Sequence, residues 1–505
     1  MVLLDGNSLT LDALVAIASH GERVGIAPAA IDRVRASRAV VDRCAQGEAA
    51  VYGINTGFGS FAEVKIPADS LDALQVNLLR SHAAGVGDPL SVPLVRAMIA
   101  LRANVLAKGY SGIRPGTLLQ LVEFLNRRVH PVVPARGSVG ASGDLAPLAH
   151  LSLVLIGEGE AWVDDGGRES GAAALARAGL KPTALAPKEG LALINGTQAS
   201  TALLGLALAG AERLARAADV TAALSIDGLQ GSMKPFDPRI HEARGFAGQS
   251  TAAANIAALL AGSGINAAHA NCGRVQDAYS MRCAAQVHGA AREAFRFGCE
   301  VFDTEANAAT DNPMVFSEEG DIVSGGNFHG APVGIAADLV CIGLAQLATI
   351  SERRSERLVN PALSGLPAFL TRHGGLQSGL MMAQVTAAAL TSELKTLTYP
   401  ASVDTIPTSA NKEDHVSMSM AAGLKAMRAL ELAQQVLAVE LLCACQAIDL
   451  LAPLTSSPPL MRVHDFIRAR VPTLDDDRPP SRDLAIITDL IASGELGRAS
   501  AANVN

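Results

Sequence analysis

A long segment bounded by Pro332 and Pro361 is apolar on two opposite sides of the helix that its spacing predicts. One side carries Ile335, Leu339 and Ile342, and the other carries Val340, Leu344 and Leu347. A helix that is apolar on two sides has to be buried between neighbouring helices. The segment 421–451 has a similar pattern, so the chain is expected to fold around a bundle of long helices.

The composition also favours a mainly α fold. Hydrophobic residues make up 49% of the 505 residues and aromatic residues only 3%, so small aliphatic side chains, which favour helix, must fill the core. Helical stretches alternate with glycine-rich breaks in residues 1–200, whereas residues 201–505 are more continuously helical. We therefore expect a loop-rich N-terminal region over 1–200 and, over 201–505, a helical bundle with a C-terminal helical region. The apolar excess predicts burial between subunits as well.

Several classes of function are disfavoured. The net charge is −8, without the basic stripe typical of nucleic-acid binders. The seven cysteines are scattered without metal-ligand spacing, so no metal site is expected. The N-terminus lacks a signal peptide's basic region, and the uncharged stretch 250–273 is too polar to span a membrane, which favours the cytoplasm. Motifs for phosphate transfer, nicotinamide binding, zinc hydrolysis and serine hydrolysis are absent.

The segment Gly137–Asp144 (GSVGASGD) is the strongest chemical signal. Its simplest interpretation is a flexible turn, because glycine and serine dominate turns. The alternative is self-cyclisation of Ala141-Ser142-Gly143. The Gly143 amide nitrogen would attack the Ala141 carbonyl, and Ser142 would lose its hydroxyl as water, which leaves an exocyclic methylidene. Glycine permits the tight approach, and only a β-hydroxyl residue such as serine readily leaves an unsubstituted methylidene.

The flanking residues favour cyclisation. Gly140–His150 (GASGDLAPLAH) closely resembles the signature of the aromatic amino acid ammonia-lyases and aminomutases. The resemblance continues through these blocks: Tyr52–Gly59, Asn77–His82, Asn195–Thr197, Gln276–Cys283, Gly325–Phe328 and Glu413–Met418. It implies an ammonia-lyase and fumarase-like helical fold, with a loop-rich N-terminal part that bears the reactive group. It also implies that Ala141, Ser142 and Gly143 form the 4-methylidene-imidazol-5-one (MIO) prosthetic group.

The resemblance assigns roles that the residue types alone would not. Tyr52, otherwise a packing residue, becomes the candidate base for the substrate β-proton, provided that nearby cations or donors favour its phenolate. Arg282, otherwise part of a structural ion pair, becomes the partner of the substrate carboxylate. Asn195 and Tyr279 would donate hydrogen bonds to the charge that develops on MIO. The family positions that line the ring or the substrate are Asn195, Gln276, Tyr279 and Phe328.

Three residues bear on the substrate. Ser81-His82 resembles the histidine-specific members of the family, because His82 can hydrogen-bond an imidazole where other members offer an apolar contact to a phenyl ring. Glu413 can accept an imidazole N–H, although a solvated helix residue is its ordinary interpretation. Lys412 departs from the family, which more often has glutamine there; it could favour ionised Glu413 or point away.

These features imply the elimination of ammonia from L-histidine to give trans-urocanate. The alternatives are a tyrosine or phenylalanine ammonia-lyase or aminomutase with the same prosthetic group, and a non-catalytic helical scaffold. The sequence does not distinguish attack on MIO by the substrate amine from attack by its ring. The resemblance also implies a homotetramer with active sites shared between subunits, which binds a small molecule and neither nucleic acid nor membrane.

Overall fold

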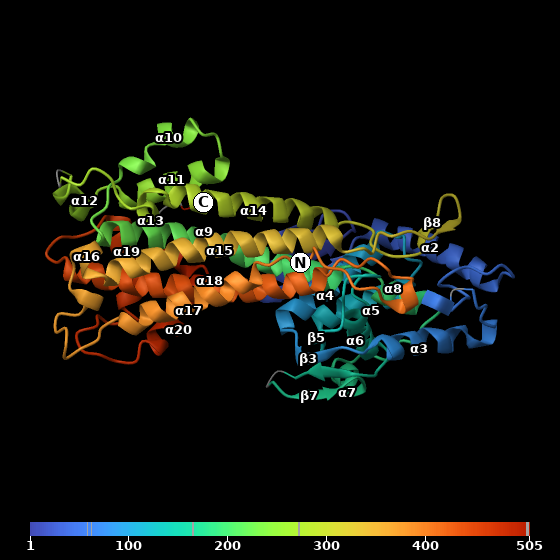
Figure 1. Cartoon of the computed structure of the whole chain (residues 1–505). Coiled ribbons are helices and arrows are strands. Elements are labelled where there is room, and N and C mark those ends of the chain that lie inside the picture. The colour runs from blue at the N-terminus through green and yellow to red at the C-terminus, as the bar shows by residue number, and fades with distance from the viewer. Residues whose placement is uncertain (58, 62, 164–165, 271–272, 501–503, 505) are drawn as a thin grey trace. The chain divides into compact units, whose positions relative to one another are not determined.

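The computed structural model describes residues 1–57, 59–61, 63–163, 166–270, 273–500 and 504, and it is built mainly from α-helices (Figure 1). These residues form two compact units. The first unit contains Met1–Leu206, Cys299–Asp338 and Pro400–Lys425, and the second contains Ala207–Gly298, Leu339–Tyr399 and Ala426–Asn505. The prediction of a mainly α fold is confirmed. The predicted division into residues 1–200 and 201–505 stays a prediction. The two compact units are each made of three segments that are distant in the sequence.

The first unit is a set of shorter helices with small strands between them. Its helices are α1 (Leu11–His20), α2 (Pro28–Gln46), α3 (Leu71–His82), α4 (Val92–Ala107), α5 (Pro115–Asn126), α6 (Leu145–Leu155), α7 (Gly171–Arg177) and α8 (Glu189–Ile194), with 3-10 turns η1 (Gly59–Phe61), η2 (Ala68–Ser70) and η5 (Ser409–Asn411). Its strands are β1 (Val2–Leu4), β2 (Val24–Ile26), β3 (Val86–Pro89), β4 (His130–Pro131), β5 (Pro134–Arg136), β6 (Glu160–Trp162), β7 (Arg168–Ser170), β8 (Met314–Phe316) and β9 (Asp321–Val323).

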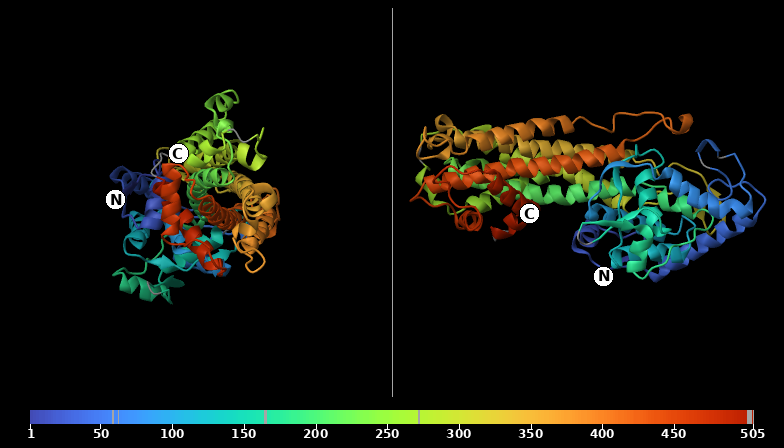
Figure 2. Two further views of the ribbon diagram at one scale, coloured as in Figure 1. Left: turned by 90° about the vertical axis from the view of Figure 1, so that its left-hand side faces the viewer. Right: turned by 90° about the horizontal axis from the view of Figure 1, so that it is seen from below.

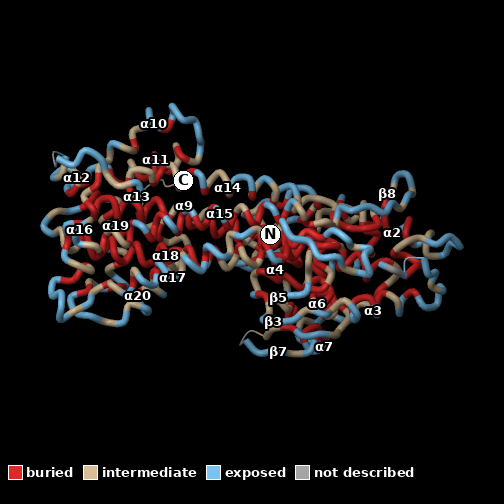
Figure 3. Tube along the Cα trace, in the orientation of Figure 1, coloured by how far each residue is buried: buried red, intermediate tan, exposed pale blue. Residues whose placement is uncertain are grey.

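These strands form small sheets that join the helices of the first unit. β1 pairs with β2 in parallel, whereas the pairs β3–β5 and β8–β9 and the three strands β4–β6–β7 are antiparallel. Helix α4 forms the centre of this unit, because every residue from Leu94 to Ala107 is buried (Figure 3). A helix buried on all sides is covered by the neighbouring helices and loops, and these carry the predicted site residues of the first unit.

Four long helices contribute residues to both units, and shorter helices complete the second unit. The long helices are α9 (Gln198–Gly228), α14 (Ala284–Glu305), α15 (Ala331–Val359) and α18 (Ser419–Leu450). The shorter elements are η3 (Lys234–Phe236), α10 (Pro238–Glu242), α11 (Ala247–Leu260), α12 (Gly264–Ala268), α13 (Tyr279–Arg282), α16 (Pro361–Ser364), η4 (Ala368–Leu370), α17 (Met381–Leu397), α19 (Pro458–Arg468), α20 (Ser481–Ala492) and α21 (Glu495–Ala499).

Within the second unit the long helices lie side by side, and small residues set their spacing (Figures 1 and 2). A Cβ atom at Gly210 of α9 would lie 2.2 Å from Leu430 of α18, and one at Gly343 of α15 would lie 2.7 Å from Phe295 of α14. Such approaches require glycine, which explains why a chain with few aromatic residues can still pack a dense core. The predicted bundle of long helices is present, but only one of the two apolar sides of α15 is buried in it. Val340, Leu344 and Leu347 are buried, whereas Ile335 and Ile342 on the other side are 49% and 39% exposed in the chain.

Two of these helices resemble membrane spans by composition. Among the described residues, α15 and α18 are long and apolar enough to cross a membrane, with mean hydropathies of 1.9 and 1.3 over their most apolar windows. However, 72% and 83% of those windows are buried inside the protein. Burial of this extent is typical of helices in a protein core.

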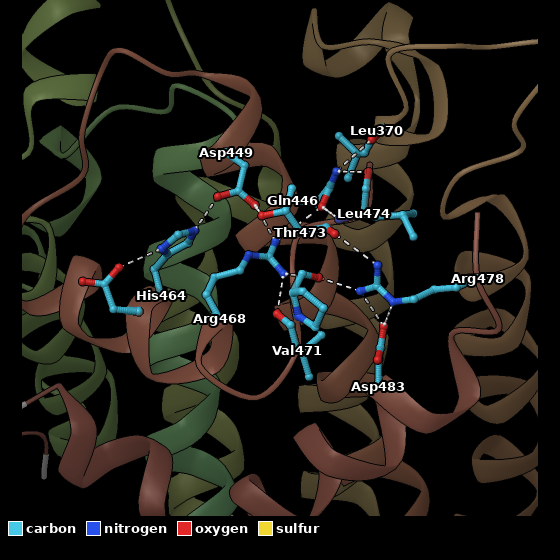
Figure 4. Close-up of polar contacts among 12 residues, drawn as sticks. Leu370, Gln446, Asp449, His464, Arg468, Val471, Thr473, Leu474, Arg478 and Asp483 are labelled. Atoms are coloured by element: carbon cyan, nitrogen blue, oxygen red, sulfur yellow. Dashed lines mark hydrogen bonds and ion pairs between the residues drawn. The ribbon is translucent and has the colours of Figure 1, made fainter. Parts of the chain in front are cut away.

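The end of the chain is attached to α18 by a cluster of polar contacts (Figure 4). Asp449 of α18 accepts hydrogen bonds from His464 Nε2 at 2.7 Å and from Thr473 Oγ1 at 3.0 Å, and it forms an ion pair with Arg468 at 2.7 Å. Gln446, one turn earlier, binds the backbone N–H and C=O of Leu474. Burial alone would raise the pKa of Asp449, but His464 and Arg468 hold that pKa below its ordinary value. The cluster therefore stabilises the C-terminal segment against the bundle.

Replacing Asp449 by asparagine is expected to destabilise the protein. The variant leaves His464 and Arg468 without their carboxylate, so the free energy of unfolding should fall by about 2 kcal/mol, the usual value for a hydrogen-bonded charge. Calorimetry would show a lower midpoint of thermal unfolding. Asp489→Asn, at an exposed position of α20, is the matched control. Equal midpoints for the two variants would contradict a stabilising role for the cluster.

Candidate active site

The tripeptide Ala141-Ser142-Gly143 lies in a tight turn between β5 and α6. Gly143 has a φ of 72°, and a Cβ atom at this residue would lie 2.3 Å from the carbonyl oxygen of Gly196. The next backbone N–H, that of Asp144, donates to the same oxygen at 2.7 Å. Only glycine combines a left-handed φ with so close an approach. The turn is thereby held against the segment that joins α8 to α9.

Asn195, at the end of α8, directs its side chain at this turn. Its Nδ2 donates to the carbonyl oxygen of Ser142 at 3.1 Å, and its buried Oδ1 has no hydrogen-bond partner within the described chain. Arg102 of α4 holds the backbone of Asn195, because its Nη1 donates to the Asn195 carbonyl at 2.7 Å. Burial lowers the pKa of this fully enclosed guanidinium to about 10. Asn195 is thus a fixed donor to the tripeptide.

The block Glu413–Met418 supports the tripeptide from the other side. Ala141 packs against Val416 and Met418 in a small buried cluster. Ser417 Oγ donates to the carbonyl oxygen of Gly140 at 2.9 Å. These contacts join the blocks Gly140–His150 and Glu413–Met418, which are far apart along the chain.

Glu413 lies next to the tripeptide and is held as a carboxylate. Its Oε1 accepts from Ser142 Oγ at 2.5 Å, and its Oε2 accepts from Thr408 Oγ1 at 2.6 Å and from Ser409 Oγ at 2.8 Å. Burial alone would raise the pKa of Glu413, but these three hydrogen bonds and the neighbouring His82 together bring that pKa below its ordinary value. Lys412 is exposed and is not among the groups that shift the pKa of Glu413.

Ser81 and His82 end helix α3 beside Glu413. His82 Nδ1 lies 2.9 Å from the carbonyl oxygen of Leu78 and 3.0 Å from Ser81 Oγ. A carbonyl oxygen only accepts, so Nδ1 carries the hydrogen, and Nε2 of the neutral ring is left as an acceptor. Burial lowers the pKa of His82, which favours this neutral ring, although Leu78 and Glu413 partly offset the effect. The pair therefore presents an acceptor nitrogen beside a carboxylate.

Tyr52 lines the same space, but its surroundings do not favour the phenolate. Burial raises the pKa of Tyr52, and the negative charge of Glu413 adds to that increase, whereas a backbone hydrogen bond from Gly59 partly offsets it. The expectation from the sequence was that cations or donors would favour phenolate here. Within this chain the net shift of the Tyr52 pKa has the opposite direction.

Two cavities of the first unit meet at these residues. The Phe328 cavity has a volume of about 590 Å³ and the His82 cavity about 620 Å³. Both are lined by Tyr52, Gly59, Ser142, Asn195, Ser409 and Glu413. The Phe328 cavity adds polar side chains, among them Asn312, His329 and His415, whereas the His82 cavity adds mostly apolar ones, among them Leu74, Leu78 and Leu191. The mostly apolar His82 cavity, with His82 Nε2 and the Glu413 carboxylate as acceptors, therefore adjoins the polar Phe328 cavity. Ser142 lines both cavities.

Most of the predicted site residues are brought together here, and three are not. Tyr52, Ser81, His82, Ala141, Ser142, Asn195, Phe328 and Glu413 line the two cavities, and Gly143 lies in the adjoining turn. Gln276, Tyr279 and Arg282 belong to the second unit and line neither cavity. Tyr279 is 70% exposed, and the Arg282 guanidinium stacks over its ring at 4.6 Å.

The structure adds residues that sequence reasoning missed. Thr408 and Ser409 bind Glu413, and His329 and His415 stack with ring centroids 5.7 Å apart on the wall of the Phe328 cavity. Hydroxyl residues in a loop carry no distinctive signal. His415 lies within the block Glu413–Met418 and His329 directly follows the block Gly325–Phe328, so their positions could have been noticed.

The fold and the site together are those of an aromatic amino acid lyase. The family model for aromatic amino acid lyases matches residues 9–469, and the chain belongs to this family. A histidine ammonia-lyase of Anaeromyxobacter sp. (strain K) is 56% identical over 503 residues, which cover 98% of this chain and 99% of that protein. The crystal structure of histidine ammonia-lyase from Trypanosoma cruzi is 44% identical, with a TM-score of 0.92, and covers 99% of this chain and 95% of that one. The predicted family is confirmed, and the chain is a lyase rather than a non-catalytic scaffold.

Likeness of fold does not separate the substrates within this family. The tyrosine aminomutase from Streptomyces globisporus has a TM-score of 0.94 to this chain at 37% identity, with 99% of this chain and 98% of that one covered. Its backbone is therefore as similar as that of the T. cruzi enzyme. Substrate preference must be argued from the side chains that line the cavities.

Proposed function

We propose that this enzyme eliminates ammonia from L-histidine to give trans-urocanate, the reaction of a histidine ammonia-lyase. The observation that carries the proposal is the pair of acceptors beside Ser142: the carboxylate of Glu413 and Nε2 of His82. The neutral imidazole of L-histidine has one N–H that can pair with one of these acceptors, whereas a phenyl ring has none and would leave both without a donor from the substrate. Unpaired buried acceptors are costly, so the site favours the imidazole. The identity of the relatives supports the same substrate.

The residues present fit the MIO prosthetic group. Gly143 has a left-handed φ in the tight turn that the tripeptide forms, and Asn195 donates to the Ser142 carbonyl, where negative charge would gather. The buried Oδ1 of Asn195 has no hydrogen-bond partner among the described residues, so it can accept from a donor that the rearranged turn or the substrate brings. When formed, the group supplies an electrophilic carbon that converts the substrate amine into a better leaving group.

Tyr52 is the proposed base for the β-proton of the substrate. It lines both cavities, within the space that a substrate next to Ser142 would occupy. Because its pKa is raised in the isolated chain, the phenol remains protonated at neutral pH unless a cation approaches. No cation is among the described groups that shift the pKa of Tyr52, so the proposal requires a positive group to approach Tyr52 in the assembled enzyme.

A neighbouring subunit is the proposed source of that group. Gln276, Tyr279 and Arg282 match family site residues, yet they line neither cavity, and Tyr279 is largely exposed. We place them in the site of another copy within a homotetramer, where Arg282 would pair with the substrate carboxylate.

The described cysteines are free thiols, which agrees with a reducing cytoplasm.

The test is turnover of L-histidine by the purified protein. The ultraviolet absorbance of urocanate should rise with L-histidine, whereas L-tyrosine and L-phenylalanine should give a kcat/KM lower by about 10³-fold or more, since a site built for a hydrogen-bonding ring discriminates by 10⁴–10⁵ at best. Turnover of L-tyrosine without any response to L-histidine would overturn the substrate assignment and favour the tyrosine-specific alternative.

A further inference from the structure

We propose that Thr408 and Ser409 are positioning residues that fix Glu413 as an ionised acceptor with one free oxygen for the substrate ring. The inference rests on the proposed function, because it assigns the device that makes the cavity selective for an imidazole. Neither residue belongs to a block that the sequence comparison singled out, and neither bears chemistry of its own.

The first support is the division of hydrogen bonds between the two oxygens of Glu413. Thr408 Oγ1 and Ser409 Oγ both donate to Oε2, at 2.6 and 2.8 Å. Oε1 has a different partner, Ser142 Oγ at 2.5 Å. Two donors on one oxygen occupy its lone pairs and leave no room for a proton, so Oε2 stays negative and fixed.

The second support is the backbone between these residues. Ser409, Ala410 and Asn411 have φ values of 51°, 52° and 65°, so three consecutive non-glycine residues form a left-handed turn. Such a conformation costs about 1–2 kcal/mol for each residue and persists only where its surroundings enforce it. The turn is closed by the N–H of Thr408, which donates to the Glu413 carbonyl at 2.9 Å. This closure brings both hydroxyls back onto the side chain of Glu413.

The free oxygen then depends on Ser142. As an intact serine it occupies Oε1, but cyclisation would remove its hydroxyl as water. Oε1 would lose its donor while Oε2 remains held by Thr408 and Ser409. Oε1 of Glu413 would then be free to accept one hydrogen bond. The N–H of an imidazole can donate that hydrogen bond, and a phenyl ring cannot.

The other groups around Glu413 do not replace the two hydroxyls. His82 contributes the smallest of the effects that lower the pKa of Glu413, and Tyr52 faces the carboxylate as an uncharged phenol. Lys412 and Asp414 are exposed on either side of it in the sequence, and neither is among the causes of the shift. The hydrogen bonds from Ser142, Thr408 and Ser409 therefore oppose the effect of burial on the pKa of Glu413. After cyclisation only those from Thr408 and Ser409 would remain.

The experiment compares Thr408→Val, Thr408→Ser and Ser409→Ala with Thr304→Val, an exposed threonine on α14. Thr408→Val and Ser409→Ala should each lower kcat/KM for L-histidine by about 10- to 100-fold, as for one hydrogen bond to a charged group. With fewer donors the pKa of Glu413 rises, so the acidic limb of the pH profile should move to higher pH by about one unit. Thr408→Ser should restore both quantities, and Thr304→Val should leave them unchanged.

Two measurements separate this inference from the proposed function. Calorimetric binding of imidazole should weaken by the same factor in Thr408→Val, whereas the ultraviolet absorbance of the prosthetic group should stay as in the wild type. A wild-type protein that ignores L-histidine would refute the proposed function, and the imidazole titration would still decide the role of Thr408. An active wild type with an unchanged pH profile and unchanged imidazole binding in both variants would overturn the positioning role.

Discussion

Replacing Ser142 by alanine is expected to lower kcat for L-histidine by about 10³-fold or more, the size of loss seen when a covalent catalyst is removed. Alanine has no β-hydroxyl to lose, so the methylidene cannot form, although Gly143 and Asn195 keep the turn in place. The variant should fold normally, because the change removes one hydroxyl, which donates to Glu413 on the wall of a cavity. Urocanate absorbance measures turnover, and a difference spectrum against the wild type measures the missing ultraviolet band.

The matched control is Ser493→Ala, an exposed serine near the end of the second unit. It should keep both activity and absorbance. Full activity in Ser142→Ala would refute the role of the tripeptide. A variant that loses activity but keeps the ultraviolet band would show that the absorbing group is made elsewhere, and the mechanism would then need another electrophile.

The tripeptide and its surroundings were predictable because cyclisation demands particular residue types at adjacent positions. Gly143 illustrates the point: its left-handed φ and its contact with Gly196 are what the chemistry requires of a glycine. The bundle of long helices was predictable as well, although the chain itself buries only the side of α15 that carries Val340, Leu344 and Leu347 and leaves Ile335 and Ile342 exposed.

The positions of Thr408 and Ser409 were not predictable from the sequence. Their hydroxyls act only because the left-handed turn at 409–411 returns the chain onto Glu413, and nothing in that tripeptide favours a left-handed backbone, apart from Asn411. The pKa of Tyr52 was also missed, because burial and the charge of Glu413 depend on the tertiary arrangement. The effect of Lys412 stayed open in the sequence for the same reason; in the structure Lys412 is exposed and is not among the groups that shift the pKa of Glu413.

The structure also explains why a common fold can serve different rings. The turn at Ser142 and the donor Asn195 line both cavities, so the chemistry can stay constant while the walls of the His82 cavity change. Most of that wall is apolar and would suit any aromatic ring. We therefore expect discrimination to be concentrated in the polar atoms of that wall, chiefly those of Ser81, His82 and Glu413.

Replacing Glu413 by alanine is accordingly expected to lower kcat/KM for L-histidine by about 10³-fold, since the N–H of the substrate loses its charged acceptor and Thr408 and Ser409 lose theirs. The slow turnover of L-phenylalanine should fall far less, because a phenyl ring makes no hydrogen bond with Glu413. The ratio of the two kcat/KM values, rather than either value alone, is the quantity to measure. Glu318→Ala, at the exposed turn between β8 and β9, is the control.

The same ratio distinguishes specificity from general damage. If Glu413 acted only by supporting the fold or the tripeptide, both substrates would lose activity equally, and the ultraviolet band would weaken with them. A selective loss with an intact band would instead locate the discrimination between an imidazole and a phenyl ring at the carboxylate itself. Burial opposes the ionisation of that carboxylate, whereas the hydrogen bonds from Thr408 and Ser409, which remain after cyclisation, lower its pKa. The preference for histidine should then persist from weakly acidic to alkaline pH and decline only as the pH falls through that pKa.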